Sequence, residues 1–443
     1  MTIPPTDGSR TFLFMPESAY GPTNNCIGIA GKLQERGHRI VFAVDPSWAG
    51  KLSYYGFEEQ LVDLTPPEED AADATEQDSG DFWKEYIREI SPEFRKPTLD
   101  QIGSVVKGIW EGAIDGAKYC EPRLREIVRD VSPDVVIEDN VICFPALVTG
   151  GPPFVRIVSC NPLEIPGQEI APAYSGLAED DRTGWAEYRK RTDELVRPLW
   201  NEYNDWVQQQ GAPPLPEMEF IHSGAHNLYL YPDELDYVDR RPLGPAWTQL
   251  DSAVRQIRFG VDLPDEVKER FGQSGRPLIY FSLGSLGGAD VDLMRQLISE
   301  LSTVDANIVV SKGPRADELE LADNMWGEEM VAQTRIIPHA DLVITHGGNN
   351  TVTESMHAGK PMILLPLFWD QYDNAQRVHE RGYGIRVDTY AHTPDQMHEA
   401  IDTLLRDQEM RDRCARAGDR IRQVDGLSVA ADTLERVAQE HSR

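Results

Sequence analysis

The chain has 443 residues, of which 40% are hydrophobic and 8% aromatic, and its formal net charge at pH 7 is −31. This length predicts two or three domains, each with a core of its own, rather than a disordered chain. The acidic charge argues against a nucleic-acid-binding protein and against binding to an anionic membrane surface, because both need basic patches.

The apolar runs are also too short for a membrane protein. The run at 361–369 stops well short of the roughly 20 residues that a spanning helix needs. The N-terminal ten residues lack the apolar core of a signal peptide. The five cysteines are scattered without a C-x-x-C pair, which indicates reduced thiols rather than disulfides or zinc ligands. We therefore expect a cytoplasmic enzyme without integral membrane association.

The N-terminal half alternates predicted strands and helices. A strand at 11–15 is followed by a loop, a helix at 26–36 and a second strand at 39–44. This is a βαβ unit, and such units build parallel sheets. Further apolar runs, which predict more strands, lie at 134–140, 154–159 and 227–232.

A second pattern of the same kind follows a polar stretch. We expect an N-terminal domain at 1–235, a linker at 236–275 and a second domain at 276–425, with a final helix at 426–443 that can cross back onto the first domain. The predicted class is α/β, with two Rossmann-like parallel-sheet domains that face a cleft. Ligands of such sheets bind at the carboxyl ends of the strands.

Residues 346–376 carry the clearest chemical signal. They lead from a predicted strand through glycines into a helix, and Gly348 lets the backbone approach a ligand closely. Asn350 or Thr351 is expected to cap that helix. The backbone N–H groups and the dipole at the helix start suit a phosphate, and His346 can add a hydrogen-bond donor.

Three further polar residues of this segment suit a sugar. Glu354 lies one turn into the helix, where it can accept hydrogen bonds from a diol such as ribose. Asp370 and Gln371 follow the next strand and face the same cleft. A carboxylate and an amide together suit sugar hydroxyls, so the segment predicts a site for a sugar that bears a diphosphate.

The spacing of this segment resembles the donor-binding signature of glycosyltransferase family 1, the UDP-glycosyltransferase superfamily with the GT-B fold, in its bacterial natural-product type. The matching residues are His346, Gly348, Asn350, Thr351, Glu354, Asp370 and Gln371. Upstream, Ser285 in the run FSLGS resembles the family's glycine-serine turn near the diphosphate.

The resemblance implies a role for each matching residue. Gln333 contacts the nucleoside and Glu354 the ribose. The diphosphate contacts Ser285 and the residues of the strand–helix turn, and the sugar contacts Asp370 and Gln371. The chain has Met330 where the family often has a Trp that stacks on the base. A UDP-sugar is favoured over a TDP-sugar, and no metal or other cofactor is required.

The first loop departs from the family pattern. Family members usually carry a histidine there that deprotonates the acceptor hydroxyl, and this chain has Tyr20. Tyrosine is a poor base at neutral pH, because its reference pKa is about 10. Asp139 matches the acidic residue that normally orients the histidine, and Glu17 ends the first strand. Either carboxylate could serve as the base if burial raises its pKa.

The predicted function is therefore an inverting transfer of a sugar, with glucose expected, from a nucleotide diphosphate to a hydroxyl of a small molecule. The aromatic N-terminal half suggests an aromatic or polycyclic acceptor. Two alternatives stay open: a nucleotide-sugar epimerase on the same fold, and a non-catalytic protein that binds sugar nucleotides.

Overall fold

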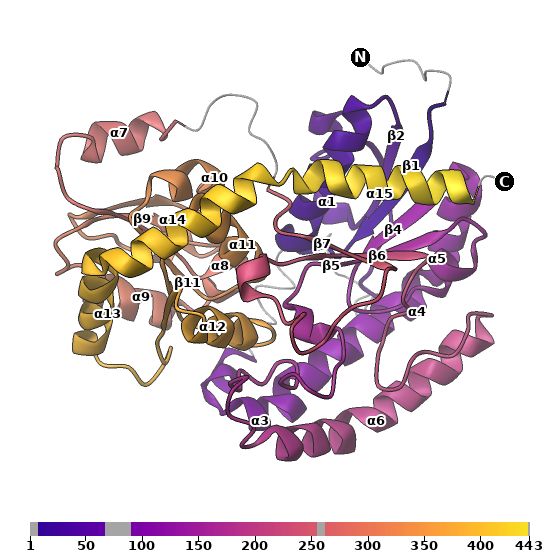
Figure 1. The fold of residues 1–443 in the computed structure, drawn as a ribbon, viewed down its shortest axis with the longest axis horizontal. Coiled ribbons are helices and arrows are strands. Elements are labelled where there is room, and N and C mark those ends of the chain that lie inside the picture. Colours follow the sequence, from indigo (N-terminus) through magenta and orange to yellow (C-terminus); the bar gives the residue numbers. More distant parts are fainter. Residues whose placement is uncertain (1–7, 67–89, 255–261, 442–443) are drawn as a thin grey trace, which may run out of the picture.

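The computed structural model describes residues 8–66, 90–254 and 262–441, except for the side chains of residues 285 and 286. Figure 1 shows two α/β lobes side by side, with the N-terminal half of the chain in one and most of the C-terminal half in the other. Among these described residues, no helix is long and apolar enough to cross a membrane.

The sheet of the N-terminal lobe is parallel throughout. Its described strands lie in the order β3-β2-β1-β4-β5-β6-β7. Their bounds are β1 (Thr11–Pro16), β2 (Arg39–Val44), β3 (Glu58–Leu61), β4 (Val135–Asp139), β5 (Phe154–Val158), β6 (His226–Leu230) and β7 (Trp247–Leu250). The inner strands β1, β4, β5 and β6 are almost wholly buried and mostly apolar, because helices cover both faces of the sheet.

The helices of this lobe pack on the two faces of that sheet. They are α1 (Tyr20–Glu35), α3 (Thr98–Gln101), α4 (Lys107–Val131), α5 (Pro145–Thr149) and α6 (Trp185–Gln209). The helix predicted at 26–36 begins earlier than expected, at Tyr20. Pro22 does not prevent this, because it lies in the first turn, where its missing N–H would have no partner within the helix.

The C-terminal lobe has a second parallel sheet with the described order β10-β9-β8-β11-β12-β13. These strands are β8 (Leu278–Ser282), β9 (Asn307–Ser311), β10 (Met325–Glu328), β11 (Leu342–Thr345), β12 (Met362–Leu364) and β13 (Gly384–Arg386). The helices are α7 (Asp265–Phe271), α8 (Gly284–Gly287), α9 (Val291–Leu301), α10 (Gln333–Ile336), α11 (Asn349–Ala358), α12 (Gln371–Glu380), α13 (Pro394–Arg406), α14 (Gln408–Gln423) and α15 (Gly426–Glu440). The predicted class, two parallel-sheet α/β domains, is confirmed.

The predicted linker at 236–275 is wrong at both ends. At its start, β7 pairs in parallel with β6 and so extends the first sheet to Leu250. Towards its end, α7 packs Val267 into the core of the second lobe with Tyr280 and Val309. In a sequence, short polar strands and helices next to prolines and glycines resemble a linker. The pairing of β7 with β6 in the structure shows that β7 belongs to the sheet.

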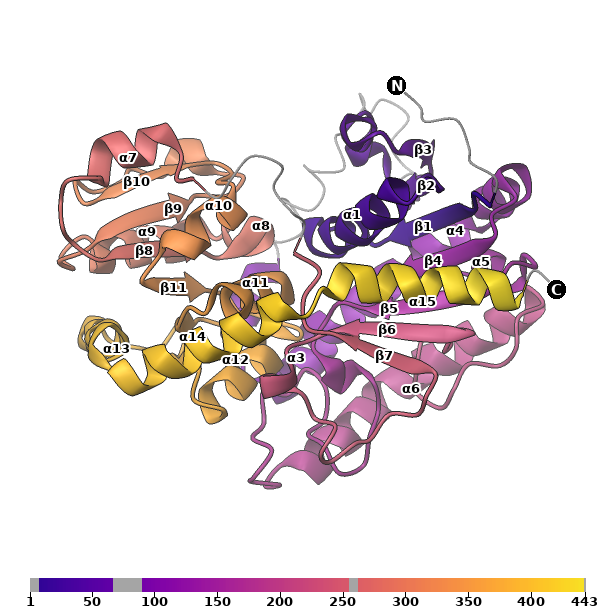
Figure 2. The same ribbon diagram turned by 45° about the horizontal axis from the view of Figure 1, so that its top comes forward.

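The C-terminal helices join the lobes. Figure 2 shows α14 against the second lobe and α15 lying across the first. Helix α15 packs on α1, and its Ala430, Leu434 and Val437 share a core with Ile29 and Leu33. The end of the chain therefore completes the hydrophobic core of the N-terminal domain.

Candidate functional site

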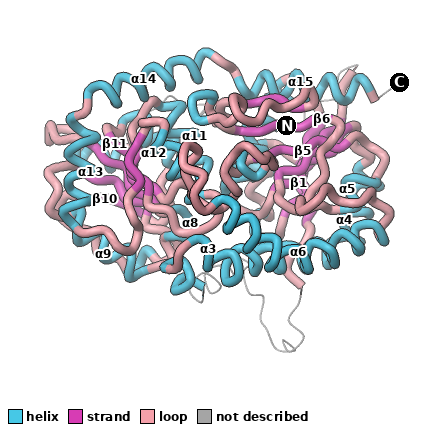
Figure 3. The backbone as a smooth tube through the Cα atoms, turned by 60° about the horizontal axis from the view of Figure 1, so that its bottom comes forward, coloured by secondary structure: helices cyan, strands magenta, loops and turns pink. Residues whose placement is uncertain are grey.

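The site lies where the carboxyl ends of strands from both sheets meet. In the first domain Glu17 directly follows β1, Asp139 ends β4 and Ser159 directly follows β5. In the second domain His346 directly follows β11, and Asp370 precedes α12. Figure 3 shows α8, α11 and α12 on the side of the second lobe that faces the first.

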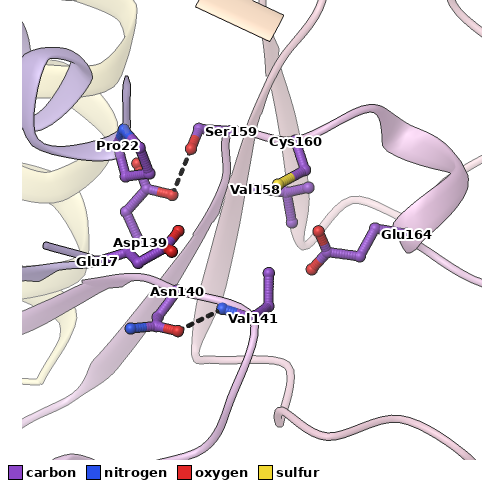
Figure 4. A pocket seen from close by; sticks show the side chains of 9 residues that line it. All are labelled: Glu17, Pro22, Asp139, Asn140, Val141, Val158, Ser159, Cys160 and Glu164. Atoms are coloured by element: carbon purple, nitrogen blue, oxygen red, sulfur yellow. Dashed lines mark hydrogen bonds between the residues drawn. The ribbon is translucent and has the colours of Figure 1, made fainter. Parts of the chain in front are cut away.

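A small acidic pocket opens at this junction, on the side of the first domain. Figure 4 shows that carboxylates of three segments, Glu17, Asp139 and Glu164, lie around it. Its lining is completed by Pro22, Asn140, Val141, Val158, Ser159 and Cys160. Its volume of about 10 Å³ is roughly the space for one water molecule, so an organic acceptor does not fit into it in this conformation.

Asp139 is held at the floor of this pocket. Its side chain is only 2% exposed. The Ser159 hydroxyl donates a 2.7 Å hydrogen bond to Oδ1, and the Cys26 thiol lies 3.9 Å from Oδ2. Burial raises the pKa of Asp139 to about 8, and the carboxylate of Glu17 adds to the rise. A carboxyl group of this kind can take up a proton near neutral pH.

Glu17 lies beside Asp139 at the end of the neighbouring strand. Its backbone N–H donates to the carbonyl oxygen of Asp139 at 2.8 Å, which holds the two strand ends together. Burial and then the charge of Glu164 raise the pKa of Glu17 to about 7. Glu164 itself is paired with the guanidinium of Arg156 at 2.7 Å. Glu17 and Asp139 therefore lie side by side at the strand ends, and burial raises the pKa of both.

Tyr20 lies outside the acidic pocket. Its ring is 38% exposed and packs on Trp48 with a centroid distance of 5.2 Å. The amine of Lys51 lies 5.8 Å from the ring centroid. The phenol therefore belongs to a half-exposed aromatic pair at the start of α1, and the carboxylates lie deeper.

His346 is clamped between two glycines. A Cβ atom at Gly284, which has a φ of +73°, would lie 2.6 Å from the imidazole, and one at Gly348 would lie 2.5 Å from it. Burial lowers the pKa of His346 to about 4, so the ring is neutral at physiological pH. It can still donate one hydrogen bond to an anion.

The start of α11 differs from the predicted cap. The N-cap is Gly348, and no side chain caps this helix. Asn350 instead reaches the first domain: its amide donates to the carbonyl of Gly21 at 2.9 Å and accepts from Asn25 at 2.8 Å. Thr351 lies buried in the first turn. The N-cap position is therefore taken by Gly348, and the Asn350 side chain makes its hydrogen bonds across the domain boundary instead.

The two residues predicted to bind the nucleoside are brought together. The Gln333 amide donates to Glu354 at 2.7 Å, and the Tyr280 hydroxyl donates to the Gln333 carbonyl at 3.2 Å. Met330, three residues before Gln333, is 59% exposed. Ser285 lies in α8, but its side chain is outside the described part of the structure.

Asp370 and Gln371 are buried at the domain boundary. The backbone N–H of Asn161 donates to Asp370 Oδ2 at 2.9 Å. Burial raises the pKa of Asp370 to about 7. The Gln371 side-chain oxygen accepts from the backbone N–H groups of Leu367 at 3.0 Å and Phe368 at 3.4 Å, so it shapes the loop before α12.

Three residues of the loop after β5 also reach this site, although the sequence does not single them out. Ser159 donates to Asp139, Asn161 reaches Asp370, and Glu164 adds a third carboxylate to the pocket. A signal was present, since the polar run SCNPLE follows an apolar strand in the same way as the predicted site residues do. Within the described residues, no group of three or more His, Cys, Asp or Glu side chains is placed to hold a metal ion.

Comparison with known proteins agrees with this architecture. Residues 295–423 match the family described as erythromycin biosynthesis protein CIII-like, C-terminal domain. The chain is 24% identical over 428 residues to the NDP-glycosyltransferase YjiC of Bacillus subtilis strain 168, which covers 94% of both chains. It is 25% identical over 426 residues to the oleandomycin glycosyltransferase of Streptomyces antibioticus, covering 94% of this chain and 88% of that one.

Solved structures resemble the fold over nearly the whole chain. The glycosyltransferase VinC, determined in complex with dTDP, has a TM-score of 0.64 at 20% identity and covers 97% of this chain and all of its own. The signature at residues 346–376, the two parallel-sheet domains and these relatives support a nucleotide-sugar-dependent glycosyltransferase with the GT-B fold, similar to the bacterial natural-product glycosyltransferases of family 1.

Proposed function

We propose that the chain is an inverting glycosyltransferase that transfers a sugar, glucose in the first instance, from a nucleotide diphosphate to a hydroxyl group of a small aromatic or polycyclic molecule. The observation that carries this proposal is the opposition of two groups of residues across the domain boundary. His346, Glu354 and Asp370 gather on one side, and Glu17 and Asp139 face them from the other.

The second domain would bind the donor. The diphosphate would lie at the N-terminus of α11, where Gly348 leaves the first backbone N–H groups without a side-chain cap. Neutral His346 would donate to the same anion, and the side chain of Ser285 is expected nearby. Gln333 and Glu354, which already share a hydrogen bond, would hold the nucleoside and its ribose. Asp370 and the amide of Gln371 would hold the sugar.

The first domain would activate the acceptor. The acceptor oxygen attacks the anomeric carbon in line as the bond from that carbon to the diphosphate breaks, so the configuration inverts. The proton of the hydroxyl passes to a carboxylate, with Asp139 first and Glu17 second. The leaving diphosphate keeps the bonding electron pair, and its charge is stabilised by the helix N-terminus and His346 without a metal ion.

We expect the base of the donor nucleotide to be uracil or thymine. Met330 in place of a stacking Trp removes the feature that would fix the base, and the structural relative VinC was solved with dTDP. UDP-sugars remain the preferred candidates, and TDP-sugars belong in the same panel.

The experiment is a panel of UDP- and TDP-sugars, each incubated alone and with a panel of aromatic and polycyclic acceptors, followed by mass spectrometry. We expect donor consumption only when an acceptor is present, with a product heavier by one hexosyl unit. Conversion of a donor alone would indicate the epimerase. Binding without consumption of any donor would indicate the auxiliary protein.

A further inference from the structure

Asn161 of the first domain contacts two residues of the second, Asp370 and Asn374. It lies in the loop after β5 and is 1% exposed. Its backbone N–H donates to Asp370 Oδ2 at 2.9 Å, and its side-chain amide donates to Asn374 Oδ1 at 2.9 Å. Two residues of the second domain are therefore held by one residue of the first.

The side chain of Asn161 is itself fixed from two further directions. Its amide also donates to the hydroxyl of Tyr231 at 3.0 Å, and its oxygen accepts from the backbone of Leu163 at 2.9 Å. A side chain with every polar atom engaged has one orientation, so its backbone N–H points at Asp370 in a fixed direction.

Asn374 extends this network towards the diphosphate turn. It is fully buried, and its amide donates to the carbonyl of Gly347 at 2.9 Å and to Asp370 Oδ2 at 3.4 Å. Asp370 Oδ2 thus has two donors, one from each domain, and together they orient the carboxylate.

We infer that Asn161 is a positioning residue for the donor sugar: it fixes Asp370 from the acceptor-side domain, so that sugar recognition is completed only when the two domains are together. This inference rests on the proposed role of Asp370 in holding the sugar. It adds that the nucleoside diphosphate is recognised by the C-terminal domain alone, whereas the sugar is recognised by both domains.

The test compares binding of a nucleotide with binding of its sugar derivative. Calorimetric Kd values are measured for UDP and UDP-glucose, and for TDP and TDP-glucose, with the wild-type chain and with Asn161→Ala. Asn161→Ala keeps the backbone N–H that binds Asp370 but removes the side-chain hydrogen bonds that fix its direction. We expect it to weaken binding of the sugar nucleotide about tenfold, while the Kd of the nucleoside diphosphate stays within about twofold. A structural defect alone would weaken both.

Two variants keep the result interpretable. Tyr231→Phe removes one partner of the Asn161 amide and should give a smaller effect of the same kind, which covers the case in which Asn161→Ala does not fold. Arg386→Gln removes another hydrogen bond across the domain boundary, the 2.8 Å bond to the carbonyl of Gly176, and should leave the ratio of the two Kd values unchanged.

Asp370→Asn separates the failure of this inference from the failure of the proposed function. If Asp370→Asn lowers affinity for the sugar nucleotide and both Asn161→Ala and Tyr231→Phe leave it unchanged, the positioning role is wrong and the sugar site stands. If Asp370→Asn also has no effect, or if the wild-type chain binds UDP-glucose and UDP, and TDP-glucose and TDP, equally well, Asp370 holds no sugar and both fail.

Discussion

At the scale of single residues, the proposed base is a buried carboxylate, because Tyr20 stands where the family usually has histidine. Asp139 and Glu17 share a pocket in which burial raises the pKa of the first to about 8 and of the second to about 7. Tyr20, at the position where the family has histidine, packs on Trp48 near the surface. We therefore propose a buried carboxylate, rather than Tyr20, as the proton acceptor.

The Asp139→Asn variant tests this assignment. It should lower kcat/KM by a factor of roughly 10²–10⁴, the usual contribution of a general base, whereas Tyr20→Phe should keep much of the activity. Both are measured with one purified acceptor at saturating donor. Near-normal turnover in both Asp139→Asn and Glu17→Gln would rule out a carboxylate base and favour an acceptor that ionises unaided.

The raised pKa values also predict a pH profile. A base works in its ionised form, so kcat/KM should rise as the pH increases through about 7 to 8 and level off above that range. His346 should add no step there, because burial lowers its pKa to about 4. A rate that is constant from pH 6 to 9, or the same profile in Asp139→Asn and Glu17→Gln, would contradict the assignment.

His346 is expected to act as a neutral donor to the diphosphate. The His346→Ala variant should weaken binding of the nucleoside diphosphate by about 1.5–3 kcal/mol, the range for a hydrogen bond to a charged group. Because the imidazole stays neutral, the loss should be the same at pH 6 and pH 8. Calorimetry gives both values, and an unchanged Kd would show that the diphosphate lies elsewhere.

At the scale of elements, the C-terminal helix α15 packs into the core of the N-terminal domain. Leu434 is fully buried in the core that α15 shares with α1, whereas Gln439 on the same helix is exposed. Leu434→Ala should lower the free energy of unfolding by about 2–5 kcal/mol, the usual range for this truncation in a core. Gln439→Ala should stay within about 0.5 kcal/mol. Denaturant titration compares them, and equal stabilities would mean that α15 does not hold this domain.

The elements also show what sequence patterns can and cannot predict. Strand β2 begins and ends as predicted at 39–44, because a short apolar run with turn residues before and after it has clear limits in the sequence. Strand β7 and the first turn of α1 were missed. The residues of β7 are mixed in polarity, and a proline near the start of α1 resembles a loop although the first helical turn accepts it.

At the scale of the whole molecule, the site depends on how the domains meet. The sequence predicts that His346, Glu354 and Asp370 belong to one site of the second domain, because they lie close together in the chain at a recognisable spacing. It could not predict that Asn350 binds Gly21 or that Asn161 binds Asp370, because these pairs are separated by 329 and 209 residues. Contacts between domains leave no period or spacing in a sequence.

Further contacts hold the two domains against one another. Helix α12 rests on the first domain through Asp373, which accepts from the backbone of Tyr174 at 2.6 Å and of Gly176 at 2.8 Å. The domains are therefore closed on one another. The residues proposed as the base and those proposed to bind the donor belong to different domains, so the proposed reaction depends on this arrangement.

The stereochemistry of the product tests the central claim most directly. An acceptor that the panel identifies is glycosylated with an α-linked nucleotide sugar, and the anomeric configuration of the product is read by NMR. In-line attack by an oxygen that a carboxylate of the first domain deprotonates predicts a β-glycoside and one equivalent of nucleoside diphosphate. An α-glycoside would contradict this account.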